Sequence, residues 1–418
     1  MFSERRLSPG STPGRVEPAS PSMRAGGFRD MWALDPGVLY LNHGSFGACP
    51  VDVLEYRAAL TRELEAAPME FLVRRLPEML QAALDYAEKL VRAEPGSIVF
   101  VPNATHGVNT VLGSFGLRPG DEVLVGSHEY FATLNACRIH CERAGAVCTV
   151  VPMPFPVSGP GDIHDAFLSR VTPATRLVVV DHITSATAFV CDPAPLVAEL
   201  RGRGIETLVD GAHGPGMVPL DMGTLGAAFY TGNFHKWLCS PKVCAMLYVR
   251  PDMQERIHPL ATSHLPCDFD SGQTPFRIEF QWIGTPDPTA ALSVPRAGEY
   301  LASLLPGGLP AVMQANRALA LEARRLICDS LGVEPPCPDS MVGSMASFEL
   351  PWIDPPDPPM PDWVWMDPLQ RRLLEEFRTE VPVSYIRRER LRLLRISAQL
   401  YNDISQYEYL AESLGRML

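Results

Sequence analysis

Two stretches, ETLVDGAHGPG (residues 206–216) and AAFYTGNFHKW (residues 227–237), decide how this chain folds. Each begins as a short apolar run and passes into glycine and polar residues, which is the pattern of a buried strand that ends in a turn. Asp210 ends the first run and Lys236 follows the second. In an open α/β sheet the ligand crevice lies at the carboxyl ends of the strands, so both side chains are predicted to lie there.

Similar apolar runs precede this region and alternate with helix-like segments. Helices are expected over residues 51–68 and 72–93, where apolar residues recur at three- and four-residue spacing. Short apolar strands separated by helices predict right-handed βαβ units and a mostly parallel sheet that is covered on both faces. The runs upstream of residue 206 are SIVFVPN (97–103), DEVLVGSH (121–128), AVCTVVPM (146–153) and RLVVVDHI (176–183).

Composition and hydrophobic periodicity divide the chain into three parts. Residues 1–30 are dominated by Pro, Gly, Ser and Arg and are predicted to form a disordered tail, with a transit peptide or a start mis-assigned upstream of Met23 as the alternatives. Residues 31–290 are predicted to hold an N-terminal segment and a large domain. Residues 291–418 combine long helical runs with strand-like stretches and are predicted to form a smaller α/β domain.

Composition excludes some classes of function. The 418 residues carry a formal net charge of −12, which argues against nucleic acid as a partner, and no 18-residue apolar run indicates a membrane-spanning helix. The ten cysteines are scattered along a chain that is too long to need disulfides, so we expect reduced thiols and a cytoplasmic location. Cys137 and Cys141 have the spacing of metal ligands on a helix, but we interpret them as apolar filler and predict no metal site.

Three pieces of the sequence suggest chemistry. A lysine at the crevice, such as Lys236, can form a Schiff base with an aldehyde, although a single lysine at a turn is more simply a surface residue. Asp210 on its own is more simply a helix cap or a turn residue. The segment VPNATHGVN (101–109) passes from strand to helix, and a helix N-terminus offers a phosphate free N–H groups and a favourable dipole. An ordinary helix cap at this point is compatible with phosphate binding.

Taken in order, these pieces resemble the pyridoxal-phosphate (PLP) enzymes of fold type I. The sequence motifs are similar to those of the class V aminotransferase superfamily. Within it they resemble the branch that contains isopenicillin N epimerase, L-cysteine desulfhydrase and hercynylcysteine sulfoxide lyase. The resemblance covers about residues 36–415 and implies a large domain with a mostly parallel seven-stranded sheet, plus a smaller C-terminal α/β domain. It is carried by LYLNHGSFG (39–47), PMEFLVRRLP (68–77), DHITSATA (181–188), VDGAHGPG (209–216), GNFHKW (232–237), WIGTPDP (282–288) and RISAQLYN (395–402).

The resemblance implies PLP as the cofactor. Lys236 would hold it as a Schiff base and then move the α-proton of the substrate, while Asp210 would pair with the ring nitrogen and keep the ring an electron sink. His213 would lie near the phenolic oxygen, and Tyr130 would stack on the ring, although many relatives have Gly where this chain has Phe131. The phosphate cup would consist of Thr105, His106, Asn233, His235 and, from a neighbouring subunit, Thr285. This arrangement implies a homodimer with shared active sites.

Arg395 is the predicted substrate residue. A guanidinium can hold the α-carboxylate of an amino acid through two parallel hydrogen bonds. Without the resemblance, a surface arginine beside Arg390 and Arg392 is the simpler interpretation. Further predicted substrate contacts, each with a scaffold role as the alternative, are Asn42, His43, Thr184 and Ser185, and His264 is a weaker candidate.

The resemblance implies removal of the Cα proton and leaves several outcomes open. We favour a C–S lyase that acts on cysteine or an S-substituted cysteine; an amino-acid epimerase of the isopenicillin N epimerase type is the first alternative. An aminotransferase and a non-catalytic binding module of the same fold are further alternatives. A cysteine desulfurase is disfavoured, because such enzymes use a cysteine shortly before the carboxylate-binding arginine and this chain has none between Cys337 and Arg395.

Overall fold

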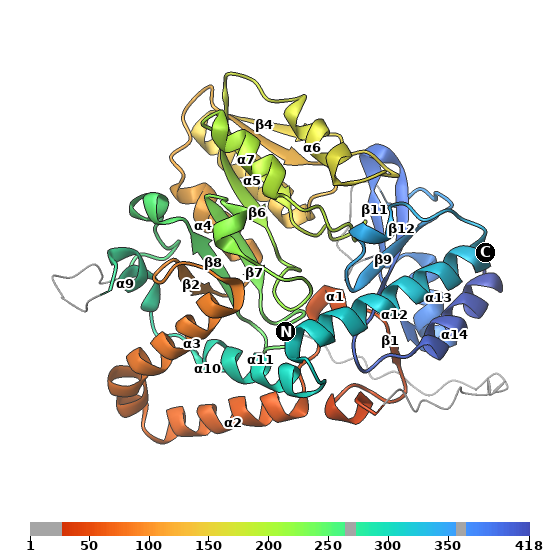
Figure 1. Ribbon diagram of the computed structural model, residues 1–418, viewed down its shortest axis with the longest axis horizontal. Coiled ribbons are helices and arrows are strands. Elements are labelled where there is room, and N and C mark those ends of the chain that lie inside the picture. The colour runs from red at the N-terminus through yellow and green to blue at the C-terminus, as the bar shows by residue number, and fades with distance from the viewer. Residues whose placement is uncertain (1–26, 264–272, 357–364) are drawn as a thin grey trace, which may run out of the picture.

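The computed structural model describes residues 27–263, 273–356 and 365–418, and a seven-stranded sheet forms its centre (Figure 1). Only β8 runs against the other strands, so the prediction of a mostly parallel sheet is confirmed. In spatial order the strands are β2 (Ile98–Val101), β8 (Ala245–Val249), β7 (Phe229–Asn233), β6 (Glu206–Asp210), β5 (Thr175–Asp181), β3 (Glu122–Gly126) and β4 (Val147–Val151).

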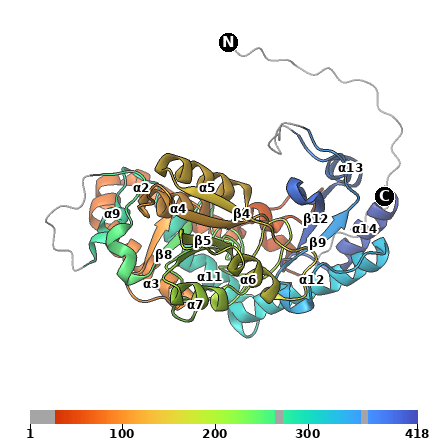
Figure 2. The same ribbon diagram turned by 90° about the horizontal axis from the view of Figure 1, so that it is seen from above.

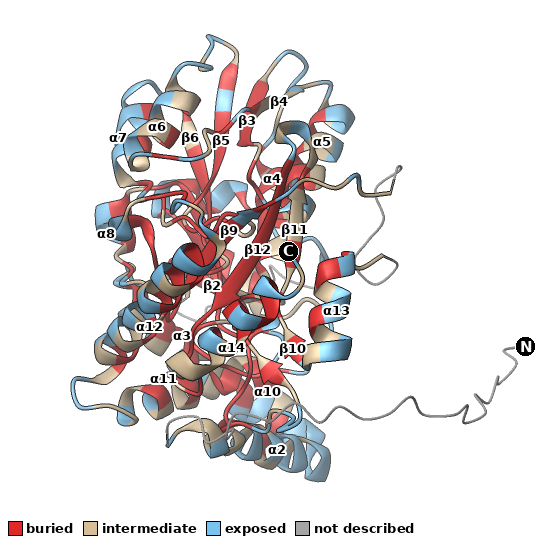
Figure 3. Ribbon diagram, turned by 90° about the vertical axis from the view of Figure 1, so that its right-hand side faces the viewer, coloured by how far each residue is buried: buried red, intermediate tan, exposed pale blue. Residues whose placement is uncertain are grey.

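Helices cover both faces of this sheet because successive strand residues point to opposite sides. In β3, for example, Val123 and Val125 join one hydrophobic core and Leu124 joins the other. The first core is covered by α4 (Ala104–Ser114), α5 (Phe131–Ala144) and α9 (Pro275–Gln281). The second is covered by α3 (Leu76–Val91), α6 (Pro160–Leu168), α7 (Ala194–Gly202) and α8 (Met222–Leu225). Figure 3 shows the strands buried between helices whose outer surfaces are exposed.

The strand order indicates where on the sheet a ligand would bind. Along the chain, β3 is followed outward by β4, whereas β5, β6 and β7 continue in the opposite direction across the sheet. The direction of winding therefore reverses between β3 and β5. In open α/β sheets, ligands bind at the carboxyl ends of the strands at such a switch point.

A second, three-stranded antiparallel sheet lies beside the first (Figures 1 and 2). Its order is β11 (Val383–Ile386), β12 (Leu391–Ser397) and β9 (Met345–Leu350), and α12 (Gly308–Leu331) and α14 (Ile404–Gly415) pack on it and on each other. We call this sheet and its helices the small lobe. Helix α10 (Thr289–Leu292) spans the predicted domain boundary at residues 290–291, and that boundary stays a prediction.

The N-terminal segment crosses to the small lobe before the large sheet begins. Strand β1 (Leu39–Tyr40) pairs in parallel with β10 (Thr379–Glu380). The remaining elements are η1 (Arg29–Met31), α1 (His43–Phe46), α2 (Val51–Ala66), the π-helix η2 (Glu70–Arg75), η3 (Pro251–Arg256), α11 (Val294–Ser303), η4 (Asp339–Met341), α13 (Pro368–Phe377) and η5 (Arg387–Glu389). The structure contains the helices predicted over 51–68 and 72–93, as α2 and α3. The π-helix η2 lies between α2 and α3 and includes the first residues of the second predicted range.

The sequence predicts no membrane-spanning helix and reduced cysteines. Within the described ranges, no helix is both long and apolar enough to cross a membrane. The nine cysteines that the structure describes are free, and Cys137 and Cys141 lie in the core between α5 and the sheet. The predicted tail falls almost wholly outside the described residues, and His264 also lies outside them.

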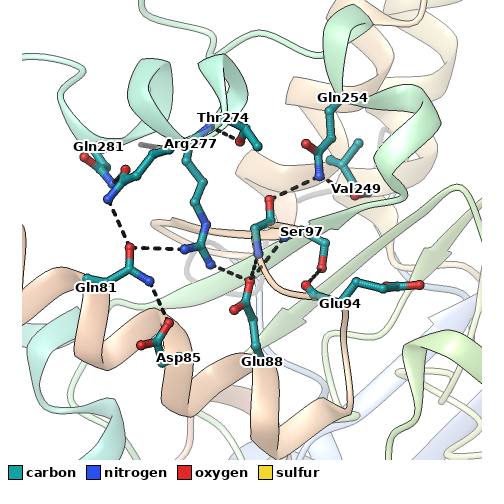
Figure 4. Close-up of polar contacts among 12 residues, drawn as sticks. Gln81, Asp85, Glu88, Glu94, Ser97, Val249, Gln254, Thr274, Arg277 and Gln281 are labelled. Carbon is teal, nitrogen blue, oxygen red and sulfur yellow. Dashed lines mark hydrogen bonds and ion pairs between the residues drawn. The ribbon is translucent and has the colours of Figure 1, made fainter. Parts of the chain in front are cut away.

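A buried ion pair fastens α9 to α3 (Figure 4). The guanidinium of Arg277 contacts the carboxylate of Glu88, and both residues are buried. Glu88 Oε1 also accepts hydrogen bonds from the backbone N–H groups of Gly96, at 2.7 Å, and Ser97, at 3.2 Å. Arg277 donates further to Gln81 Oε1 at 3.2 Å. The carboxylate thus has donors from two other segments, which fixes the helix that leads into residues 282–288.

Arg277→Ala should therefore destabilise the fold strongly. Removing one partner leaves a buried carboxylate without its cation, which typically costs about 3–5 kcal/mol of unfolding free energy. The measurement is chemical denaturation of the variant against wild type. The matched control is Arg74→Ala, which breaks an exposed pair with Glu70 and should cost only about 0.3–0.5 kcal/mol. Equal effects of the two substitutions would show that the buried pair is not an anchor.

Candidate active site

Lys236 lies in the turn after β7 with its amine against His213. Its Nζ is 3.2 Å from His213 Nε2, and Trp237 Nε1 donates to His213 Nδ1 at 3.2 Å. Because Nδ1 accepts, neutral His213 carries its proton on Nε2 and donates it to the lysine amine. Burial, reinforced by the nearby charge of Arg395, lowers the pKa of Lys236 to about 7, against the opposing pull of Asp210 and Asp181. A large share of the amine is therefore neutral near pH 7, as a nucleophile or base requires.

The backbone of Lys236 is held from behind by α1. His43 Nε2 donates to the Lys236 carbonyl oxygen at 3.0 Å, and since a carbonyl only accepts, His43 Nδ1 must accept from the Tyr401 hydroxyl at 2.9 Å. Burial lowers the pKa of His43 to about 3, so the ring stays neutral. His43 was predicted to contact substrate, but both of its ring nitrogens are occupied by protein groups. Its position is that of a support for Lys236, which is the scaffold role given above as the alternative.

Two glycines allow this close approach. Gly47 has φ = +68°, and a Cβ there would lie 2.0 Å from the His235 carbonyl oxygen and 2.9 Å from Lys236 Cα. Gly216 has φ = +87°, and a Cβ there would lie 2.4 Å from the Trp237 carbonyl carbon. Side chains at either position would clash with backbone that cannot rotate away. The turn that carries Lys236 is therefore wedged between two glycine backbones.

Asp210 ends β6 at the floor of the crevice. Its Oδ2 accepts from Thr133 Oγ1 at 2.8 Å and its Oδ1 accepts from the Ala212 N–H at 3.0 Å. Burial raises the pKa of Asp210, and these two donors together with the charge of Lys236 oppose the rise. A carboxylate held in this way is oriented by its donors and suits a cationic partner placed beside it.

The start of α4 forms one wall of the crevice. Asn103 caps the helix by accepting from the His106 N–H at 2.9 Å, and Asn233 Oδ1 accepts from the Ala104 N–H at 2.9 Å. The second bond ties the end of β7 to the start of α4, so the predicted residues Thr105, His106 and Asn233 do come together. His235 Nδ1 donates to the Cys244 carbonyl at 2.9 Å, and burial lowers the pKa of His235 to about 4.

Arg395 projects from β12 toward the crevice and meets two of the predicted substrate contacts. Its Nη1 donates to the Ser185 carbonyl at 2.8 Å, and its Nη2 donates to Ser45 Oγ at 3.0 Å and Asn42 Oδ1 at 3.4 Å. Its Nε is buried and has no partner among the described residues. Burial lowers the pKa of Arg395 to about 10, so the guanidinium remains charged at neutral pH.

The other predicted residues are less tightly placed. Thr184 Oγ1 accepts from the Phe189 N–H at 2.8 Å and contacts Thr187 Oγ1 at 2.6 Å, so its hydroxyl serves the loop after β5. Tyr130 begins α5 with about half of its surface exposed, close enough for its phenol to influence the pKa of Arg395. Thr285 is exposed on the loop after α9.

Polar and apolar contacts hold the small lobe against the crevice. Glu389, in η5, accepts from His128 Nε2 at 2.7 Å and also contacts the Ser127 hydroxyl, both at the end of β3. Ile386 and Leu391, which flank η5, pack against Phe155 of the large domain. The strand that carries Arg395 is thus fixed relative to the loop that carries Tyr130.

Some functional neighbours were not anticipated from the sequence. Ser45, Trp237 and Tyr401 lie within motifs quoted above but were given no role there, and Thr133 lies outside those motifs; each contacts a predicted residue. Asp181 carried a usable signal, because it ends the apolar run of β5 as Asp210 ends that of β6.

His43→Asn should destabilise the protein less in acid than at neutral pH. The pKa of His43 is lowered on folding, so the stability of the wild type is full above about pH 6.5 and is lost as the pH falls from there toward 3. The variant lacks this loss, so its deficit in thermal midpoint should shrink between pH 7.5 and 5. Val53→Ala, a buried change without titration, should keep a constant deficit. A deficit of His43→Asn that grows in acid would contradict the neutral ring.

Comparison with known proteins identifies the family of this site. The profile of the class V aminotransferases matches residues 55–356. Isopenicillin N epimerase of Streptomyces clavuligerus is 32% identical over 93% of this chain and 97% of its own length. A putative L-cysteine desulfhydrase of Oryza sativa subsp. japonica is 30% identical over 92% of this chain and 84% of its own.

Solved structures show the same fold. The cysteine desulfurase CsdA of Escherichia coli superposes with a TM-score of 0.73 at 22% identity, over 93% of this chain and 97% of its own. That likeness confirms the predicted architecture of fold type I. The family profile and the two sequence relatives go further: this chain belongs to the class V aminotransferase family.

Proposed function

We propose that this chain is a PLP-dependent C–S lyase that acts on cysteine or an S-substituted cysteine. The observation that carries the proposal is the meeting of a near-neutral lysine amine, a buried carboxylate and a buried guanidinium in one crevice. These groups fit PLP and an amino acid: Lys236 for the aldehyde, Asp210 for the ring nitrogen and Arg395 for the substrate carboxylate. The first turn of α4, with Thr105, His106 and Asn233, fits the phosphate.

Bound PLP supplies an electron sink for the negative charge that develops at the substrate α-carbon. The amine of Lys236 removes the α-proton, and His213, through its Nε2–H, orients that amine. The buried Nε of Arg395, together with its Nη groups, offers the α-carboxylate parallel donors and fixes the α-hydrogen relative to Lys236. Tyr130 is placed to cover the cofactor ring.

The proposed outcome is cleavage of the Cβ–S bond. The bond breaks with its electron pair on sulfur, which takes up a proton and leaves as hydrogen sulfide from cysteine, or as a thiol or sulfenic acid from an S-substituted cysteine or its sulfoxide. Water converts the remaining fragment to pyruvate and ammonia. No thiol of the protein is needed. This agrees with residues 338–394, which contain no cysteine at the position where a desulfurase needs its nucleophile.

Epimerisation at the α-carbon is the second candidate, because a relative at 32% identity is named as an isopenicillin N epimerase. The two outcomes separate in proton NMR in heavy water with the PLP-loaded enzyme and a panel of L-amino acids that includes cysteine and cysteine sulfoxides. Pyruvate with a matching sulfur product supports the lyase. Loss of the α-proton signal without any keto acid supports the epimerase. Protein that stays colourless and cannot be loaded with PLP favours a binding module instead.

A homodimer with shared sites is part of the proposal. Thr285 is exposed on the loop after α9, where it can reach a neighbouring subunit. Large apolar side chains are exposed on α2, on η2 and between them, among them Tyr56, Val73 and Met69. Such exposure suits a covered surface. The cytoplasmic location and the lack of a nucleic-acid or membrane partner stay predictions.

Lys236→Ala should abolish turnover and remove the cofactor absorbance while the protein stays folded. The amine is the only group proposed both to hold PLP and to move the α-proton, so no other side chain replaces it. Release of pyruvate and the visible spectrum are the measurements. Lys89→Ala, on the exposed face of α3, is the matched control and should behave as wild type. Appreciable turnover by Lys236→Ala would refute the assignment.

Arg395→Ala should raise KM far more than it lowers kcat. Loss of a buried charge pair with the substrate carboxylate corresponds to about 2–5 kcal/mol of binding free energy. Arg395 also lowers the pKa of Lys236, so the acidic limb of the pH profile, where Lys236 loses its proton, should move to higher pH in the variant. Arg390→Ala, which removes a cation lying over the Trp352 ring, is the control. An unchanged KM would place the carboxylate site elsewhere.

A further inference from the structure

Three carboxyl groups stand in a row along the carboxyl edge of the large sheet. Asp210 ends β6, Asp181 ends the neighbouring strand β5, and Glu129 follows the next strand, β3. Asp181 and Asp210 are direct partners in the register of the sheet. All three are buried, with 3% to 8% of their surface exposed. The proposed mechanism uses only Asp210, and the other two carboxyls are without a role.

If Glu129 and Asp181 were both ionised, the contact between their side chains would have no hydrogen-bond donor. Glu129 Oε1 accepts from the Tyr130 N–H at 2.8 Å, whereas Glu129 Oε2 is buried and has no donor among the described residues. Its side chain instead contacts the carboxyl group of Asp181 at hydrogen-bond range. Two carboxylates are both acceptors, so this contact is a hydrogen bond only if one of them carries a proton.

The charges that face the pair favour a retained proton. Burial is the largest cause that raises the pKa of both Glu129 and Asp181, and the negative charge of Asp210 raises both further. Lys236 is the cation that opposes the rise at Asp181. The remaining titratable neighbours, Cys137 and Cys191, are buried thiols whose pKa is raised, so they add no charge. Like-charged carboxyls in contact bind one proton in common.

We propose that Glu129 and Asp181 share one proton, with Glu129 the donor, and that the pair acts as a positioning element carrying a single negative charge beside Asp210 and Lys236.

The single charge matters for the neighbouring groups. With two charges, the pair would disfavour ionised Asp210 and hold Lys236 more strongly in its ammonium form. With one, Asp210 can ionise while Lys236 stays close to neutrality, which is the combination that the proposed function uses. This second part of the inference rests on the proposed function, whereas the shared proton does not.

Infrared difference spectroscopy of the full-length protein tests the shared proton directly. A protonated carboxyl has a C=O stretch apart from that of a carboxylate, so the wild-type minus Glu129→Gln spectrum at pH 8 should contain one protonated-carboxyl band. Glu142→Gln, an exposed change on α5, should give no such band. Absence of the band from the Glu129→Gln difference spectrum would overturn the proposal, and this readout requires neither turnover nor cofactor.

The pH titration of the holoenzyme absorption spectrum tests the positioning role. Glu129→Gln replaces a protonated carboxyl by a neutral amide and should leave the midpoint unchanged. Asp181→Asn removes a negative charge close to the Lys236 nitrogen and should lower the midpoint by roughly one pH unit. Asp165→Asn, on the surface of α6, is the control.

The outcomes of this titration are distinguishable from failure of the proposed function. Equal downward shifts in Glu129→Gln and Asp181→Asn would show that both carboxyls are charged, and no shift in either would remove the positioning role. Either result overturns the inference. Protein that is colourless in every form would count against the PLP assignment, and the infrared result would then decide the shared proton alone.

Discussion

The crevice is organised around two cations in a buried space. Burial lowers the pKa of both Lys236 and Arg395, and the charge of Arg395 lowers the pKa of Lys236 further. Two full charges held away from solvent are costly. The two side chains differ in charge and in partners. Arg395 stays charged and donates hydrogen bonds to oxygen atoms of Asn42, Ser45 and Ser185. Lys236 is close to neutral and accepts the Nε2–H of neutral His213.

The same constraint accounts for the acidic row along the sheet. Asp210 and Asp181 both support the protonated lysine, burial makes both harder to ionise, and the charge of Asp210 makes Asp181 harder still to ionise. Burial therefore limits how many of these carboxyls are ionised at once. The sheet supplies them at fixed spacing, because neighbouring parallel strands end at one edge and place their last residues side by side.

Much of this arrangement was accessible from the sequence. The apolar runs predicted the parallel strands, and strand-end polarity placed Asp210 and Lys236 at one edge, since both follow from local periodicity and the rules of βαβ connection. The reversed direction of β8 was not predicted, because strand direction leaves no trace in an apolar run. The hydrogen-bond partners of His43 were also not predicted. Its partners, Lys236 and Tyr401, are 193 and 358 positions away, and no local pattern encodes such contacts.

The long sequence separations between His43 and its partners affect when these contacts can form during protein synthesis. During synthesis the N-terminal segment with His43 and Gly47 emerges first, yet the hydroxyl that completes its hydrogen bonds belongs to the last strand-to-helix connection of the chain. Contacts of such long range form late, after the loops between them have closed. A ribosome-bound chain can therefore complete its large sheet while the turn around Lys236 still lacks its support. The amine of Lys236 should acquire its final surroundings only after Tyr401 has left the ribosome.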